Sequence, residues 1–123
     1  MIIDDEVDFP KLVKRNLELI GDFTVTIAND GKQGLDLTRS LKPDLVLLDI
    51  MMPRIDGFKI LERLKGDADT APIPVIVVTA RGDEASRARA MQLQCQAYIN
   101  KPVGAVDLKV KIEDILQKSD MED

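Results

Sequence analysis

Short apolar runs alternate with longer segments of helical periodicity along the chain, and this alternation constrains the fold more than any other feature. The runs MII, FTVTIA, DLVLLD, IPVIVVTA and AYIN predict five strands. Two of them, at 46–48 and 75–78, are apolar at consecutive positions, which is typical of strands buried on both faces. We therefore predict an α/β domain with a parallel sheet between two layers of helices.

The segments between these runs predict five helices that pack on the sheet. We expect them from Asp8 to Ile20, after the sequence NDG, from about Asp56, over 83–93 and over 106–118. The first should place its apolar residues on one stripe: Phe9, Leu12, Val13, Leu17 and Ile20. The fourth has few large apolar residues, so it should pack less firmly than the others.

The chain of 123 residues has the size of one domain with one core. We assign residues 1–118 to this domain and residues 119–123 to a polar C-terminal tail. No run approaches the roughly 20 apolar residues that a membrane helix needs, and the N-terminus does not resemble a signal peptide. We expect a cytoplasmic protein that does not contact a membrane.

The composition excludes several classes of function. A net charge of −5 disfavours direct nucleic-acid binding by this domain, because such binding depends on an excess of Lys and Arg. The single cysteine, Cys95, cannot form an internal disulfide and is expected in the core. The absence of histidine argues against a zinc site and excludes a histidine-based catalytic triad.

Polar residues follow four of the predicted strands. Asp4, Asp5 and Glu6 come after the first strand, Asp49 after the third, Thr79 ends the fourth and Lys101 follows the fifth. Open parallel sheets bind ligands at the carboxyl ends of their strands. On neighbouring strands, about 5 Å apart, these carboxylates could share one Mg²⁺ ion. With a lysine and a hydroxyl nearby, the set suits phosphoryl transfer with Asp49 as nucleophile.

The segments IIDDE, LVLLDIMMPRIDG, PVIVVTA and AYINKP together resemble the receiver domain of bacterial two-component response regulators. The resemblance covers essentially the whole chain. It implies a flavodoxin-like sheet of strand order 2-1-3-4-5 flanked by five helices. It also implies a phosphorylation-dependent signalling switch rather than an enzyme, one that only assists its own phosphorylation and dephosphorylation.

The resemblance further implies a role for individual residues. Asp49 would accept a phosphoryl group from a phosphohistidine, and Thr79 and Lys101 would contact its oxygens. Mg²⁺ would be bound by Asp5, Asp49 and the Met51 backbone carbonyl, and by Asp4 through water. Tyr98 would act with Thr79 as the switch, and the bond between Lys101 and Pro102 would be cis.

The implied partners are a histidine kinase or a phosphotransfer protein. The fourth helix, fifth strand and fifth helix would form a surface for an effector or a second copy of the chain. Three departures from the family pattern stand out: only Met1, Ile2 and Ile3 precede the acidic pair, Gln94 replaces a glycine, and Val103 and Gly104 replace an aromatic residue after Lys101-Pro102. The first strand is therefore expected to be short.

Two other classes of function fit the sequence less well. A Mg²⁺-dependent phosphohydrolase similar to the haloacid dehalogenases would have a D-x-D pattern on its first strand and a cap domain, whereas this chain has adjacent acids and no room for a cap. A nucleotide or flavin binder would need a phosphate loop rich in glycine or hydroxyls, and DDEVDF repels phosphate unless a metal intervenes. The receiver interpretation is favoured.

Overall fold

The computed structural model describes residues 1–121, in which strands and helices alternate strictly. The strands are β1 (Ile2–Ile3), β2 (Ile27–Ala28), β3 (Val46–Leu48), β4 (Val75–Thr79) and β5 (Ala97–Asn100). The helices are α1 (Asp8–Ile20), α2 (Gly31–Leu41), α3 (Gly57–Gly66), α4 (Glu84–Gln92) and α5 (Ala105–Met121). The strands form one parallel sheet in the order β2-β1-β3-β4-β5, so the predicted fold class is confirmed.

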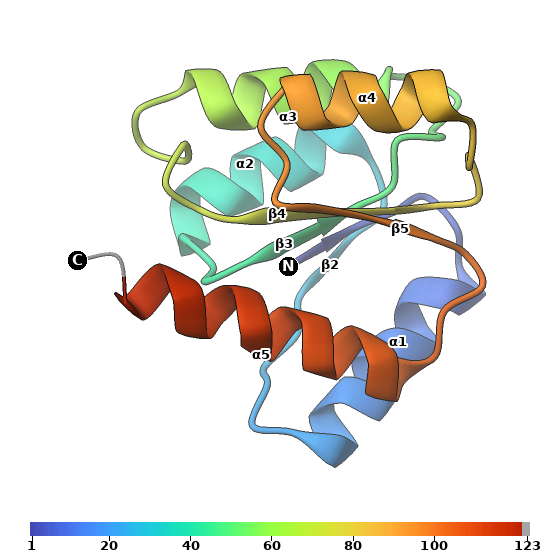
Figure 1. Ribbon diagram of the computed structural model, residues 1–123, viewed down its shortest axis with the longest axis vertical. Coiled ribbons are helices and arrows are strands. Elements are labelled where there is room, and N and C mark those ends of the chain that lie inside the picture. Colours follow the sequence, from blue (N-terminus) through green and yellow to red (C-terminus); the bar gives the residue numbers. More distant parts are fainter. Residues whose placement is uncertain (122–123) are drawn as a thin grey trace.

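The sheet separates two hydrophobic cores. Helices α2, α3 and α4 cover one face and α1 and α5 cover the other (Figure 1). Successive strand residues point to opposite faces, so Ile3 and Leu48 lie in the first core while Ile2 and Leu47 lie in the second. This two-sided burial explains why the runs are apolar at consecutive positions.

Helix α1 departs from its predicted apolar stripe. It buries Pro10, Val13 and Leu17, whereas Leu12 is 58% exposed and Ile20 is 39% exposed. Leu12 directly precedes Val13 and is therefore turned by about 100° from the buried stripe. Ile20 is the last residue of the helix. The prediction that both face the sheet was wrong.

Gln94, two residues after the end of α4, has the left-handed conformation that glycine usually supplies at a helix end. Gln94 has a φ of 72°, its N–H donates to the Met91 carbonyl, and the Cys95 N–H donates to the Ala90 carbonyl. These two bonds form a Schellman motif. The helix therefore has the usual cap, although the Cβ of Gln94 makes the left-handed conformation sterically unfavourable.

Helix α5 runs to Met121 and so extends into the segment expected as a polar tail; residues 122–123 lie outside the described residues. Cys95 is free and buried, as expected for a core residue. Within residues 1–121, no helix combines the length and the apolar character needed to cross a membrane.

Candidate functional site

The pairing of β1 with β3 places two aspartates side by side. Ile3 lies opposite Leu48, so the next residues, Asp4 and Asp49, leave the sheet together at its carboxyl edge. The Asp49 N–H donates to the Ile3 carbonyl at 2.9 Å. Asp4 is 2% exposed and Asp49 is 3% exposed. The two carboxylates are therefore largely removed from water, which is costly unless positive charge compensates them.

Asp5 completes a cluster of three carboxylates. Asp4, Asp5 and Asp49 each offer an oxygen, and these oxygens lie within 4.8 Å of one another. Burial raises the pKa of the Asp4 carboxyl above its usual value, against the opposing effect of its hydrogen bond from Lys101. Clustered carboxylate oxygens are the ligands that hard divalent cations prefer. The donor set therefore fits a bound metal ion such as Mg²⁺.

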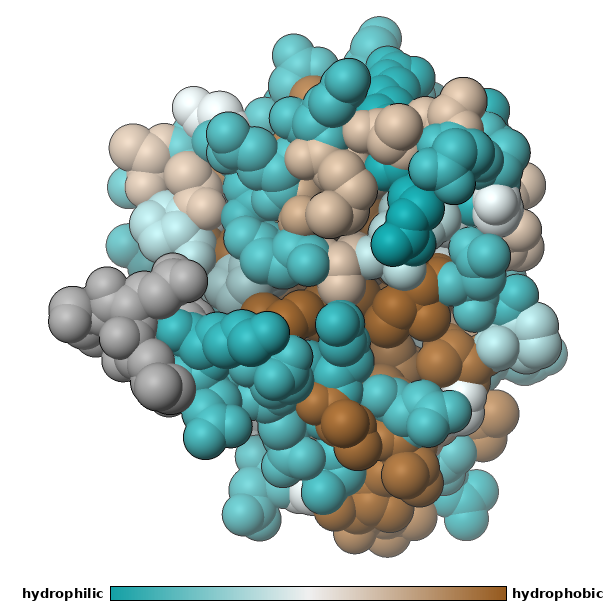
Figure 2. Space-filling view, viewed as in Figure 1, coloured by the Kyte–Doolittle hydropathy of each residue, from teal (hydrophilic) through white to brown (hydrophobic). Residues whose placement is uncertain are grey.

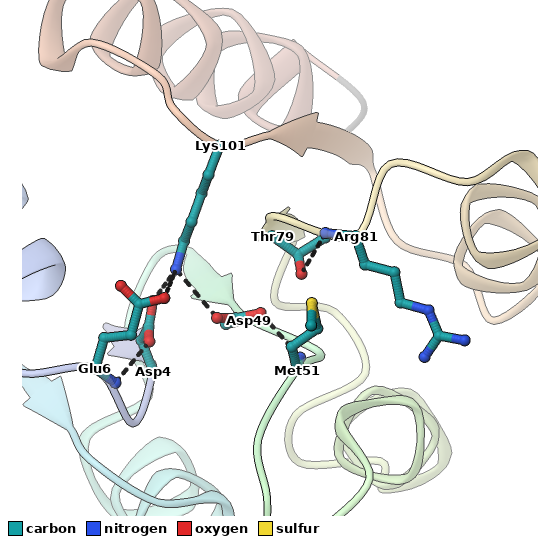
Figure 3. A network of polar contacts seen from close by, with 7 residues as sticks. All are labelled: Asp4, Glu6, Asp49, Met51, Thr79, Arg81 and Lys101. Carbon is teal, nitrogen blue, oxygen red and sulfur yellow. Dashed lines mark hydrogen bonds and ion pairs between the residues drawn. The ribbon is translucent and has the colours of Figure 1, made fainter.

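The Lys101 ammonium reaches from the end of β5 to the carboxylates and compensates part of their negative charge (Figure 3). Its Nζ donates to Asp4 at 2.9 Å, to Glu6 at 3.0 Å and to Asp49 at 3.1 Å. Burial by itself would lower the pKa of Lys101, but these three hydrogen bonds outweigh it and raise the pKa above its usual value. These contacts favour the charged form of Lys101 next to Asp49. The bond from Lys101 to Pro102 is cis.

Asp49 is held in place by its own loop as well. Its Oδ1 accepts the Met51 N–H at 2.9 Å, while its Oδ2 accepts from Lys101. The loop then packs tightly where α3 begins, because a Cβ on Gly57 would lie only 2.2 Å from the Ile50 Cα. A glycine is therefore required at this close approach.

Thr79 and Tyr98 both bond to the backbone of Arg81. The buried Thr79 hydroxyl accepts the Arg81 N–H at 3.3 Å (Figure 3). The Tyr98 hydroxyl donates to the Arg81 carbonyl, and its ring is only 8% exposed. On α4, Arg87 donates to the Tyr98 carbonyl at 3.4 Å. One loop residue thus connects the end of β4 to the aromatic side chain of β5.

The structure brings the sequence-predicted residues to one edge of the sheet. Asp4, Asp5, Asp49 and Lys101 form one polar cluster, and Thr79 ends the adjacent strand β4. The Met51 backbone belongs to the same loop as Asp49, but the Met51 residue is 52% exposed.

Three contacts of the site were not predicted from the sequence. They come from Glu6, whose carboxylate accepts from Lys101; from Arg81, which links Thr79 and Tyr98; and from Phe9, whose ring lies against the Lys101 ammonium. The third acid of the DDE run was a signal for Glu6. Phe9 lies four residues after Asp5 in the first turn of α1, but nothing in the sequence shows that a lysine 92 positions later reaches it.

The fold is a flavodoxin-like α/β domain with carboxylates and a lysine at the carboxyl ends of its strands, and this combination is typical of phosphoryl-accepting receiver domains. The chain belongs to the response regulator receiver domain family, whose sequence model matches residues 1–113. It is thus a receiver domain of two-component systems. Both the recognised family and its fold are confirmed.

Individual relatives agree with this assignment. The chain is 37% identical over 119 residues to a probable transcriptional regulator, ycf27, of Guillardia theta, covering 97% of this chain and 45% of that protein. It is 36% identical over 120 residues to the DNA-binding dual master transcriptional regulator RpaA of Synechocystis, covering 98% of this chain and 49% of that protein. The chain thus spans about half the length of these curated relatives.

Solved structures show the same fold. A CheY-like response regulator receiver domain protein from Methanospirillum hungatei superposes with a TM-score of 0.92 at 29% identity, covering 99% of this chain and 95% of that one.

Proposed function

We propose that this domain is a signalling switch in which Asp49 accepts a phosphoryl group from the phosphohistidine of a histidine kinase or phosphotransfer protein. The observation that carries the proposal is the surroundings of Asp49: a carboxylate 3% exposed, 3.1 Å from the Lys101 ammonium and clustered with Asp4 and Asp5. A buried carboxylate in contact with an ammonium group and a metal-binding cluster is what phosphoryl transfer to an aspartate requires.

The residues of the site would divide the work as follows. A bond forms between an Asp49 oxygen and phosphorus while the bond from phosphorus to the histidine nitrogen breaks, and its electron pair stays on that nitrogen. Asp5, Asp49 and the Met51 carbonyl would hold Mg²⁺, with Asp4 reaching it through water. When bound, the ion supplies positive charge to the phosphoryl oxygens. Lys101 would donate to one of those oxygens instead of to Asp49.

The response would pass through Thr79 and Tyr98. Both side chains already bond to the Arg81 backbone, so a Thr79 hydroxyl oxygen that moves toward a phosphoryl group would lengthen or break its bond from the Arg81 N–H. The loop from 80 to 83 would then move, and α4 begins directly after it. This coupling supports the proposed switch role of both residues, because it ties the state of Asp49 to the position of α4.

The surface formed by α4, β5 and α5 is proposed as the contact for an effector or a second copy of the chain. Hydrophobic residues gather over β5 and part of α5, whereas the residues over α4 are mostly hydrophilic (Figure 2). Val106 is 65% exposed and Val110 is 61% exposed, one turn apart on α5. Amide exchange with and without beryllofluoride tests the assignment, and changes confined to α2 and α3 would contradict it.

Residues 1–118 as the functional unit and a cytoplasmic location remain predictions.

Labelling with acetyl phosphate and Mg²⁺ tests the proposed chemistry. We expect wild-type protein to form an acid-stable, base-labile acyl phosphate, and Asp49→Ala to form none. Asp36→Ala, which removes an exposed aspartate on α2, is the matched control and should label like the wild type. Equal labelling of Asp49→Ala and wild type, or no acyl phosphate on either, would show that the proposed mechanism is wrong.

Two further variants separate metal binding from phosphoryl binding. Asp5→Ala should weaken Mg²⁺ binding in a calorimetric titration and slow labelling, because it removes a ligand carboxylate. Lys101→Ala should bind Mg²⁺ nearly as well as wild type and still label poorly, because the ammonium pairs with the phosphoryl group and not with the metal. A Lys101→Ala protein that labels at the wild-type rate would remove the lysine from the mechanism.

A further inference from the structure

The Lys101 ammonium has a neighbour that carries no charge. Its Nζ lies 4.2 Å from the centroid of the Phe9 ring, in the first turn of α1. The faces of aromatic rings attract cations, most strongly where water is excluded. The Lys101 side chain is only 9% exposed, so this contact is made under nearly dry conditions.

The charged partners of Lys101 cannot all persist through the proposed reaction. Asp4 and Asp49 belong to the metal-binding cluster, and a phosphoryl group on Asp49 changes the group that Lys101 meets there. The Glu6 side chain is 52% exposed, so water and salt screen its attraction for the ammonium. Phe9 binds neither a metal nor a phosphate, and its contact with Lys101 needs no exchange of partners.

The Phe9 side chain is partly buried and packs on the edge of a hydrophobic core. Phe9 packs against the core between the sheet and helices α1 and α5, as do Ile99 on β5 and Val103 in the loop after Lys101. Helix α1 begins two residues after Glu6, so the ring and the acidic run belong to one short segment. A ring held in this way offers the ammonium a constant surface.

We propose that Phe9 is a positioning residue. Its ring face keeps the Lys101 ammonium directed at the Asp49 carboxylate when Asp4 takes part in metal binding and no longer pairs with Lys101. The inference rests on the proposed function. It adds to it an aromatic group that none of the motifs in the sequence marks as part of the site.

Nuclear magnetic resonance of the metal-free protein tests the contact itself. Protons next to the Lys101 Nζ should be shifted upfield by the Phe9 ring, and Lys101→Ala identifies their signals by removing them. Phe9→Leu should abolish the upfield shift, whereas Phe9→Tyr should retain it. A wild-type protein without the shift, or a Phe9→Leu protein that keeps it, would overturn the contact whether or not the domain is phosphorylated.

The rate of labelling by acetyl phosphate with Mg²⁺ tests the role. We expect Phe9→Leu and Phe9→Met to label about fivefold more slowly, which corresponds to the loss of one largely desolvated cation–π contact. Phe9→Tyr should stay within about twofold of wild type. Mg²⁺ affinity should be unchanged in all three variants, because Phe9 is not a ligand.

Leu12→Ala is the matched control, since Leu12 lies one turn further along α1 and is 58% exposed. It should label at the wild-type rate. Wild-type rates for folded Phe9→Leu or Phe9→Met would overturn the positioning role alone. No labelling of the wild type would overturn the proposed function and this role with it, and the metal-free spectra would still decide whether the contact exists.

Discussion

Helices α3 and α4 lie on the same side of the sheet, start with the same kind of cap and differ sharply in what they bury (Figure 1). Asp56 caps α3 by accepting the Phe58 N–H, and Asp83 caps α4 by accepting the Ser86 N–H. Most of α3 faces the core, with Phe58, Ile60, Leu61 and Leu64 buried, whereas α4 buries only Ser86 and Ala90. Burial of large apolar side chains is the main source of helix stability in a folded protein.

The difference in buried apolar side chains between α3 and α4 parallels a difference between the loops that precede them. Helix α3 follows the loop of Asp49, the proposed nucleophile. Helix α4 follows the loop of Arg81, which connects Thr79 to Tyr98 and is proposed to move when the domain is phosphorylated. A helix with little buried apolar surface can shift at low cost in free energy. Firm packing thus accompanies the chemistry, and loose packing accompanies the proposed response.

The largest expected effect comes from shortening a buried side chain of α3. Leu61 is fully buried, so Leu61→Ala should lower the free energy of unfolding by about 2–5 kcal/mol. Met91 on α4 is 46% exposed, and Met91→Ala should cost less than about 0.5 kcal/mol. Urea unfolding measures both. Equal losses would show that α4 is packed as firmly as α3 and would break the comparison.

Removing the cap of α4 should have a smaller effect that depends on pH. Hydrogen bonds from the Ser86 side chain and backbone lower the pKa of the Asp83 carboxyl below its usual value. A carboxyl with a lowered pKa in the folded state stabilises the fold above its unfolded pKa and loses this contribution as the pH falls through the folded pKa.

Asp83→Ala should therefore destabilise the domain at neutral pH, less than Leu61→Ala does, and the difference from wild type should shrink below about pH 4. Asp83→Asn, which keeps an N-cap acceptor without the charge, separates the cap from its titration. A difference that stays constant from neutral to acidic pH would contradict the role of the charged carboxylate.

The smallest expected effect is a gain in stability at the end of α4. Gln94 has a φ of 72°, so Gln94→Gly should remove the steric penalty and raise the free energy of unfolding by about 0.5–1 kcal/mol, after the entropy cost of glycine. Lys42, with a φ of 46° at the end of α2, offers a matched position for the same replacement. A loss of stability at Gln94 but a gain at Lys42 would mean that the Gln94 side chain makes contacts of its own.

The order of the elements and the polar residues at the carboxyl ends of the strands were predicted well. Consecutive apolar residues and helical spacing directly reflect burial in a sheet that helices cover on both faces. The strand lengths were overestimated. The run FTVTIA contains a β2 of two residues, Ile27–Ala28. Val25 is buried but lies outside the strand, because its backbone N–H donates to Glu18 and its carbonyl accepts from Lys14. The contact of Phe9 with Lys101 depends on side chains that meet only after the sheet has formed, so no local pattern encodes it.

The contact between Tyr98 and the Arg81 carbonyl gives this protein an optical reporter of its own. The chain contains one tyrosine and no tryptophan, so its near-ultraviolet absorption and emission come almost entirely from Tyr98. That ring is buried and hydrogen-bonded to the residue that also bonds Thr79. Any change in the emission of the native protein on addition of a phosphodonor therefore originates at one known place in the fold, and the kinetics of the proposed switch can be tested without a label.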